Sequence, residues 1–285
     1  MLVDHHGLSG QASVSLSIDL SSFLRVVVVL AIAVTLVGCG RSGSYRYKLS
    51  IAVNTPNGIK RGSSVGEVLF WNVSIPARGT MQKLRGDALY LDLGLGARPL
   101  IALLTHRLRR KSADAISWSS EAGPDTRLLL QLYGEKSSED FMDDLRRVAA
   151  KRGPRKLSPD DLPDLVTFAD VNDPNSVIEV DPNDLQAMLG PGNSWNEITI
   201  EVVDEPITSG IEQKLPWIPY YYCAMLDGAR YHDKNTLANR LSTADFSFGG
   251  PPRTDEVSKA IRKEQASPGR GDCWKFVREW QQRFR

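Results

Sequence analysis

The sequence predicts an α+β fold in which an antiparallel sheet, led by a hairpin, is flanked by a few helices. Apolar residues alternate over 45–53, which is the period of a half-buried strand. A turn follows over 54–58, where Pro56 presets φ and Asn57-Gly58 accepts positive φ, and a second strand is expected over 65–73. The later elements do not alternate regularly between strand and helix, as a parallel βαβ sheet would require.

Further strands are expected from short apolar or alternating segments bounded by turn residues. They lie at 88–93, 98–104, 165–168, 177–180 and 196–203. The segment 126–133 is apolar enough for a strand or a buried helix, and its flanking glycine and proline residues favour the strand.

The clearest amphipathic helix is expected over 137–153. Ser137 is its expected cap, and Gly153 ends it. Its core face carries Phe141, Leu145 and Val148, which follow the spacing of helical turns. A short helix is expected over 181–190 and a closing helix over 273–284.

A leader precedes these elements. Arg25 stands before a twelve-residue run, Val26 to Val37, that is apolar apart from Thr35. As a helix the run would reach roughly 18 Å, whereas a bilayer core is about 30 Å thick. The run therefore fits the apolar region of a secretory signal better than a spanning helix. An uncleaved anchor over 20–37 is the alternative.

The run ends at Leu36-Val37-Gly38-Cys39, which resembles the lipobox of bacterial lipoproteins. The resemblance implies that residues 1–38 are a cleaved signal peptide and that Cys39 carries a diacylglyceryl group, with palmitate-type acyl chains. It also implies a periplasm-facing protein held on a membrane of the cell envelope. Gly40 stands where an aspartate usually signals retention in the inner membrane, so the outer membrane is favoured.

The mature chain divides into a tether and two portions. Residues 39–44 are short, polar and typical of a flexible tether. An N-terminal α+β portion is expected over 45–153 and a C-terminal one over 164–285, joined by a proline-rich link. A single domain containing both portions is the alternative, because the link is a weak boundary.

The charge balance argues against nucleic acid as a partner. Without residues 1–38 the chain keeps 34 basic and 32 acidic residues, a net charge of about +2 with histidine neutral. A nucleic-acid-binding domain is usually strongly basic. The membrane, reached through the lipid anchor, is the partner that the sequence indicates most directly.

The cysteines suggest a disulfide. If Cys39 carries lipid, Cys223 and Cys273 remain as a pair in an oxidising compartment. A bond between them would close a loop of about 50 residues and stabilise the chain by roughly 3–4 kcal/mol. Two separate buried thiols are the alternative, because spacing alone does not show that the two residues meet.

No motif predicts catalysis, a metal or a cofactor. The mature chain holds two histidines, His106 and His232, in no metal-ligand spacing. Oxygen ligands cluster over 170–175, but Pro174 breaks the calcium-loop pattern, and Asx turns explain the stretch equally well. Cys223 with His232 is a conceivable thiol–imidazole pair, although an oxidising envelope favours a disulfide.

One stretch has the composition of a recognition surface. Trp217, Tyr220, Tyr221 and Tyr222 lie among prolines, and such aromatics either form a platform for a glycan or peptide or pack as a lid over a core. Segments 45–68 and 162–206 resemble a group of uncharacterised bacterial envelope proteins, to which no activity is assigned. We therefore expect a lipid-anchored envelope protein that binds or scaffolds an envelope protein or glycan. An envelope hydrolase with dispersed active-site residues and an accessory subunit of a secretion or surface-assembly complex are the alternatives.

Overall fold

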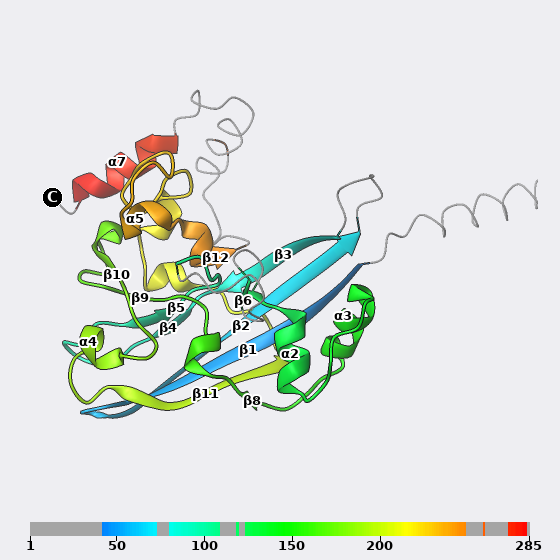
Figure 1. Ribbon diagram of the computed structural model, residues 1–285. Helices are drawn as coiled ribbons and strands as arrows, with labels where there is room; N and C mark the ends of the chain where they lie inside the picture. The colour runs from blue at the N-terminus through cyan, green and yellow to red at the C-terminus, as the bar shows by residue number, and fades with distance from the viewer. Residues whose placement is uncertain are drawn as a thin grey trace, which may run out of the picture. The chain divides into compact units, whose positions relative to one another are not determined.

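The computed structural model describes residues 42–72, 80–108, 118–119, 123–248, 259 and 273–283 (Figure 1). Residues Arg41–Arg285 form one compact unit, distinct from Met1–Gly40. The expected signal peptide and Cys39 lie outside the described residues, so both stay predictions.

A long hairpin leads the fold, as the alternating pattern predicts. Strand β1 (Ser42–Thr55) pairs antiparallel with β2 (Gly58–Asn72), and the two are joined at Pro56-Asn57. Gly58 has φ +98°, which glycine accepts without strain. Tyr45, Tyr47 and alternate residues to Val53 are buried, so one face of the hairpin covers the core.

Six strands form the main sheet, in the order β12-β3-β2-β1-β11-β8. Besides the hairpin they are β3 (Thr80–Asp87), β8 (Arg155–Lys156), β11 (Ser194–Val203) and β12 (Ser247–Phe248). All their pairings are antiparallel. Because β1 pairs with β11, the two expected portions share this sheet, and the link between them contributes β8.

A second antiparallel sheet has the order β10-β9-β5-β4. Its strands are β4 (Leu89–Leu91), β5 (Leu100–Ala102), β9 (Leu165–Phe168) and β10 (Val177–Glu179). A short pair, β6 (Trp118–Ser119) and β7 (Gly123–Pro124), forms a third. All residues of β5 and β9 are buried, so this sheet is central to the core.

Helices complete the α+β fold, which confirms the predicted fold class. The α-helices described are α2 (Thr126–Leu132), α3 (Phe141–Ala149), α4 (Leu185–Leu189), α5 (Leu237–Arg240) and α7 (Cys273–Arg283). Five 3-10 turns lie between them: η1 (Pro159–Asp161), η2 (Pro174–Ser176), η3 (Ile211–Gln213), η4 (Ile218–Tyr220) and η5 (Thr243–Asp245).

Two expectations need correction. Segment 126–133 is helix α2 and not a strand, because the Asp125 side chain caps it by accepting from the Arg127 amide at 2.8 Å. The tether over 39–44 is shorter than expected, because Ser42–Ser44 already pair with Leu69–Trp71 at the start of β1. Sheet pairing therefore begins three residues after Cys39.

The amphipathic helix forms, but over a shorter range than expected. Asp140, not Ser137, caps α3 by accepting from the Met142 amide. Leu145 of α3 lies against Gly43, and Phe141 packs edge-on to Phe70 with ring centroids 4.9 Å apart. Helix α3 thus covers the inner face of the hairpin near the start of β1.

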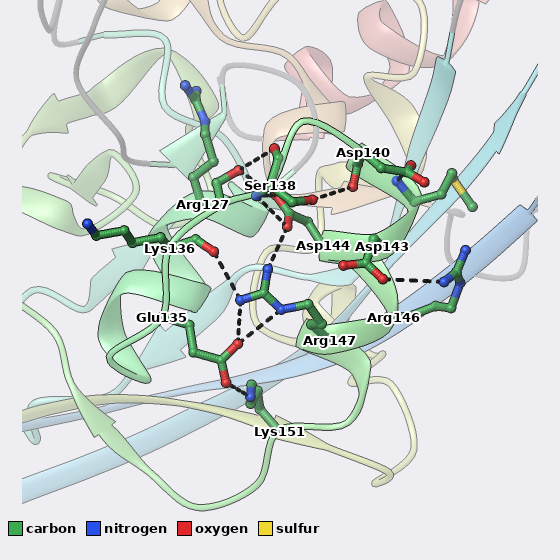
Figure 2. A network of polar contacts seen from close by, with 12 residues as sticks. Arg127, Glu135, Lys136, Ser138, Asp140, Asp143, Asp144, Arg146, Arg147 and Lys151 are labelled. Atoms are coloured by element: carbon green, nitrogen blue, oxygen red, sulfur yellow. Dashed lines mark hydrogen bonds and ion pairs between the residues drawn. The ribbon is translucent and has the colours of Figure 1, made fainter.

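A polar network fixes α3 to the loop before it (Figure 2). Asp144 is buried and accepts hydrogen bonds from Ser137 Oγ and the Ser138 amide, and Arg147 pairs with it at 3.1 Å. Arg147 also pairs with Glu135 at 2.6 Å. Burial alone would raise the pKa of Asp144, but the two serines and Arg147 hold that pKa below its usual range.

Among the residues that the structure describes, no helix has both the length and the apolar character needed to cross a bilayer.

Candidate functional site

A groove of about 470 Å³ lies where three distant segments meet. They are the loop after β9, the turn after η4 and the second half of α7. The lining residues are Asp170, Asn172, Asp173, Pro174, Asn175, Tyr221, Asp227, Trp280 and Gln281. This volume lies in the range of small-molecule sites, and the lining combines hydrogen-bonding groups with two aromatic rings.

Residues 170–175, the Asx loop, line part of the groove, and Asx turns fix their conformation. Asp170 Oδ1 accepts from the Asn172 amide at 2.9 Å, and Asp173 Oδ1 accepts from the Asn175 amide at 3.0 Å. Ser176 Oγ donates to the Asp170 carbonyl at 2.8 Å. Asx turns therefore account for the oxygen-rich composition of this loop. The described residues contain no group of three or more metal-ligating side chains placed to hold an ion.

The aromatic stretch divides between core and groove. Trp217 is fully buried, its ring lies 5.3 Å from that of Phe246, and its Nε1 donates to the Val171 carbonyl at 3.1 Å. An exposed platform that includes Trp217 is therefore not what the structure shows. Tyr221, which meets Trp217 edge-on at 6.0 Å, reaches the groove. Burial raises the pKa of the Tyr221 hydroxyl, and a hydrogen bond with Gln281 opposes that shift.

Helix α7 closes the groove and is attached through its aromatic residues. Trp280 Nε1 donates to the Asn172 carbonyl at 3.0 Å, which joins α7 to the Asx loop. The Trp280 ring lies 5.1 Å from Tyr220, and Arg283 donates to the Tyr220 hydroxyl at 3.1 Å. Gln281 lies directly over Gly228, where an added Cβ would come within 2.7 Å of its amide nitrogen.

Cys223 is disulfide-bonded, next to this helix. It packs in a small cluster with Tyr222, Trp274 and Phe276, of which the last two belong to α7. The side chain of Cys273 lies outside the described part of the chain, so its pairing with Cys223 stays a prediction. A disulfide at Cys223 removes the free thiol that a Cys223–His232 catalytic pair would need.

Asp227 also lines the groove, and its charge is compensated. Lys234 donates to it at 2.9 Å, and the buried Asn239 side chain donates to it at 3.1 Å. Burial would raise the pKa of Asp227, but these donors and the Ala229 amide lower it. Asp170 and Asp173 have no ion-pair partner in the described part of the chain. The described lining of the groove therefore contains three aspartates, of which only Asp227 has an ion-pair partner in the described part of the chain.

The two histidines occupy different settings. His106 Nδ1 lies 3.2 Å from Asp164 Oδ1, and both side chains are buried. The second oxygen of Asp164 accepts hydrogen bonds from the Arg107 and Leu108 amides. These bonds join the segment after β5 to the residue that precedes β9. His232 is exposed, with Nδ1 2.7 Å from the Asn239 carbonyl. Neither histidine lines the groove.

A second hollow, of about 280 Å³, lies on the outer face of the main sheet. Its floor consists of small residues that pair across β1, β2 and β11, among them Ser50, Ala52, Ser63 and Thr199. Arg61 and Glu197 also line this hollow, each directly opposite Ala52 in the strand pairing.

The sequence pattern singled out residues 170–175 and Tyr221, but it gave no signal that Asp227, Trp280 and Gln281 join them in one groove. Its parts are more than a hundred residues apart in the chain, from Asp170 to Gln281. Comparison with known proteins adds no relative: no protein-family model, no curated protein and no solved structure matches the chain.

Proposed function

We propose that the chain is a lipid-anchored protein of the bacterial cell envelope that binds a sugar-containing ligand in the groove between the Asx loop and α7. The observation that carries this proposal is the groove itself. Its volume of about 470 Å³ accommodates a short oligosaccharide unit, and its lining suits hydroxyl groups.

The chemistry of the lining favours a neutral, hydroxylated ligand. Carboxylates at Asp170 and Asp173 accept hydrogen bonds from hydroxyl groups, while Asn175 and Gln281 both donate and accept. Tyr221 and Trp280 also line the groove, although both are largely buried, with 2% and 4% of their surface exposed. No basic side chain is among the described residues that line the groove, and this acidic lining disfavours phosphorylated or otherwise anionic ligands.

The anchor rests on the lipobox-like Leu36 to Cys39, and the described fold is compatible with it. Figure 1 shows α7 on the far side of the molecule from the first residues of β1. A chain tethered through Cys39 would thus hold the groove away from the membrane. Metabolic labelling with an alkyne-bearing palmitate analogue tests the anchor: labelling is expected in the wild type and absent from Cys39→Ala. Labelling that persists in Cys39→Ala contradicts it.

Neighbouring glutamines on α7 offer a matched test of the groove. Gln281 lines the groove, whereas Gln282 is exposed and outside it. Titration calorimetry with a soluble tetramer of N-acetylglucosamine is the measurement, with glucose 6-phosphate as an anionic control. Loss of the Gln281 hydrogen bonds should weaken sugar binding roughly tenfold in Gln281→Ala. Gln282→Ala should bind as the wild type does.

Three results would count against the sugar site. The first is equal binding by the Gln281→Ala and Gln282→Ala variants, which would place the ligand elsewhere. The second is tighter binding of the phosphorylated sugar than of the neutral one. The third is no heat change with the wild type up to about 10 mM sugar, a concentration at which even weak sites fill.

A further inference from the structure

An apolar patch with basic neighbours lies on the outer face of the main sheet, at the end where β1 begins. We call it the Trp71 patch. It consists of Leu69 and Trp71 on β2 and Met81, Lys83 and Arg85 on β3. Trp71 is 37% exposed and Met81 39% exposed, which places both among the large apolar side chains that remain open to solvent.

The strand register assembles the patch. Trp71 lies directly opposite Met81 on one side and Ser42 on the other, and Leu69 lies opposite Lys83. Directly opposed residues of an antiparallel pair point to the same face of the sheet. The side chains of the patch therefore share the outer face, while their neighbour Phe70 points inward and packs on Phe141 of α3.

The opposite face of this sheet end is already occupied. Gly43 lies against Leu145 of α3, and the polar network of Figure 2 fixes that helix. The core therefore cannot take up Trp71 or Met81 by a small shift of the strands. The strand register determines their exposure, because a shift of one residue would move every side chain of the strand to the other face of the sheet.

The charges beside the patch are mainly positive. Glu67 pairs with Arg46 at 3.2 Å and with Arg85 at 3.4 Å, so one carboxylate is shared between two arginines. Lys83 is exposed and has no ion-pair partner in the described residues. An apolar surface rimmed by arginine and lysine is suited to a bilayer that carries anionic headgroups.

Chain length connects the patch to the proposed anchor. Two residues lie between Cys39 and Ser42, so three Cα–Cα steps join them and their Cα atoms are at most about 11 Å apart. Trp71 is one strand spacing, about 5 Å, further on. If Cys39 carries lipid, its position is fixed at the bilayer surface, and the Cα atom of Trp71 lies within about 16 Å of that point. Tryptophan is the side chain most suited to the headgroup level, where its ring is half apolar and half polar.

We infer that the Trp71 patch rests on the surface of an anionic membrane and orients the anchored domain with its groove facing away. The inference builds on the proposed lipid anchor. It adds a second membrane contact, so the domain has a fixed orientation on the bilayer and does not tumble on a loose tether.

Tryptophan quenching by brominated lipid tests the contact. The lipidated full chain is reconstituted into vesicles of phosphatidylethanolamine and phosphatidylglycerol in a ratio of about three to one, with brominated acyl chains as the quencher. Six tryptophans contribute to the emission, so we expect quenching of up to about one-sixth of it. That quenching should disappear in Trp71→Phe. It should remain in Trp195→Phe, because Trp195 pairs with Val53 at the other end of β1.

The outcomes separate the contact from the anchor. A chain that sediments with the vesicles but shows the same quenching in wild type and Trp71→Phe overturns the contact and leaves the anchor standing. A chain that stays in the supernatant overturns both. Weakening of the quenching in Lys83→Gln supports the electrostatic part of the contact. Burial of Trp71 in a dimer, seen by analytical ultracentrifugation without lipid, overturns the inference in favour of a second copy of the chain.

Discussion

Trp217 tests whether the aromatic stretch serves the core or a ligand. Its ring is fully buried and meets three others: Phe246 at 5.3 Å, Phe168 at 5.8 Å and Tyr221 at 6.0 Å. Its Nε1 donates a hydrogen bond to the Val171 carbonyl in the Asx loop. Substitution should therefore affect stability first, and the groove only through loss of the fold.

The size of the effect follows from these contacts. Trp217→Ala removes a fully buried aromatic side chain and leaves a cavity, which costs about 3–5 kcal/mol of unfolding free energy. Trp217→Phe keeps most of the ring contacts but leaves the Val171 carbonyl without its donor. We expect that variant to lose about 1–3 kcal/mol.

Urea unfolding followed by circular dichroism measures both variants. With a slope near 3 kcal/mol/M for a chain of this size, Trp217→Ala should lower the midpoint by roughly 1–1.7 M. Folded Trp217→Phe should still bind sugar. The reasoning fails if Trp217→Ala keeps the wild-type midpoint, or if Trp217→Phe keeps its stability and loses binding, because the ring would then act at a surface.

Three further predictions concern other parts of the fold. Asp144→Ala should cost about 2–3 kcal/mol at pH 7, and the exposed neighbour Asp143→Ala less than about 0.5 kcal/mol, as measured by urea unfolding. The folded-state pKa of Asp144 is lowered, so its contribution to the free energy of unfolding is complete above the unfolded pKa near 4. That contribution is lost as the pH falls through the folded-state pKa. Both variants should therefore approach the stability of the wild type in strong acid. Gly86→Ala should lower the melting temperature, because Gly86 has φ +120° and an added Cβ would lie 2.9 Å from a backbone oxygen of β2. Peptide mapping without reductant should recover Cys223 joined to Cys273.

Each of these has a result that contradicts it. Equal losses in Asp144→Ala and Asp143→Ala would mean that the buried network of Figure 2 does not stabilise α3. An unchanged melting temperature in Gly86→Ala would show that the strand shifts without cost. Recovery of Cys223 on a peptide with Cys39 would exclude lipid on that cysteine.

Local patterns predicted β1, β2, β11 and the four strands of the second sheet, but they missed β3 (Thr80–Asp87), β8 and β12 of the main sheet. Alternation over 45–53, the Asn57-Gly58 turn and the even pattern of 196–203 each correspond to a strand that buries one face. The partner of each strand was not predictable in the same way. The pairing of β1 with β11 joins residues more than 140 apart, and only packing decides it.

The errors have physical causes. Segment 126–133 carries a strand-like apolar run, but it is short, buried on several sides and capped by Asp125. It therefore forms helix α2. Helix α3 begins at Phe141 because Asp140 provides a better-placed cap than Ser137, whose hydroxyl bonds to Asp144 instead. Competing caps within one acidic stretch are not separable from sequence alone.

The groove was only partly predictable. Composition identified the Asx loop at 170–175 and the aromatic stretch at 217–222 as unusual. It did not indicate that Trp217 turns inward while Tyr221 reaches the groove, or that Asp227 and α7 complete the site. Those relations depend on how η4 and α7 pack, which no local pattern reports.

The most direct test of the central claim is calorimetric titration of the wild type, Gln281→Ala and Gln282→Ala with the N-acetylglucosamine tetramer. We predict saturable binding by the wild type and Gln282→Ala, and binding about tenfold weaker by Gln281→Ala. Identical isotherms for the two variants, or no binding by the folded wild type, would contradict the assignment of the groove as a sugar site.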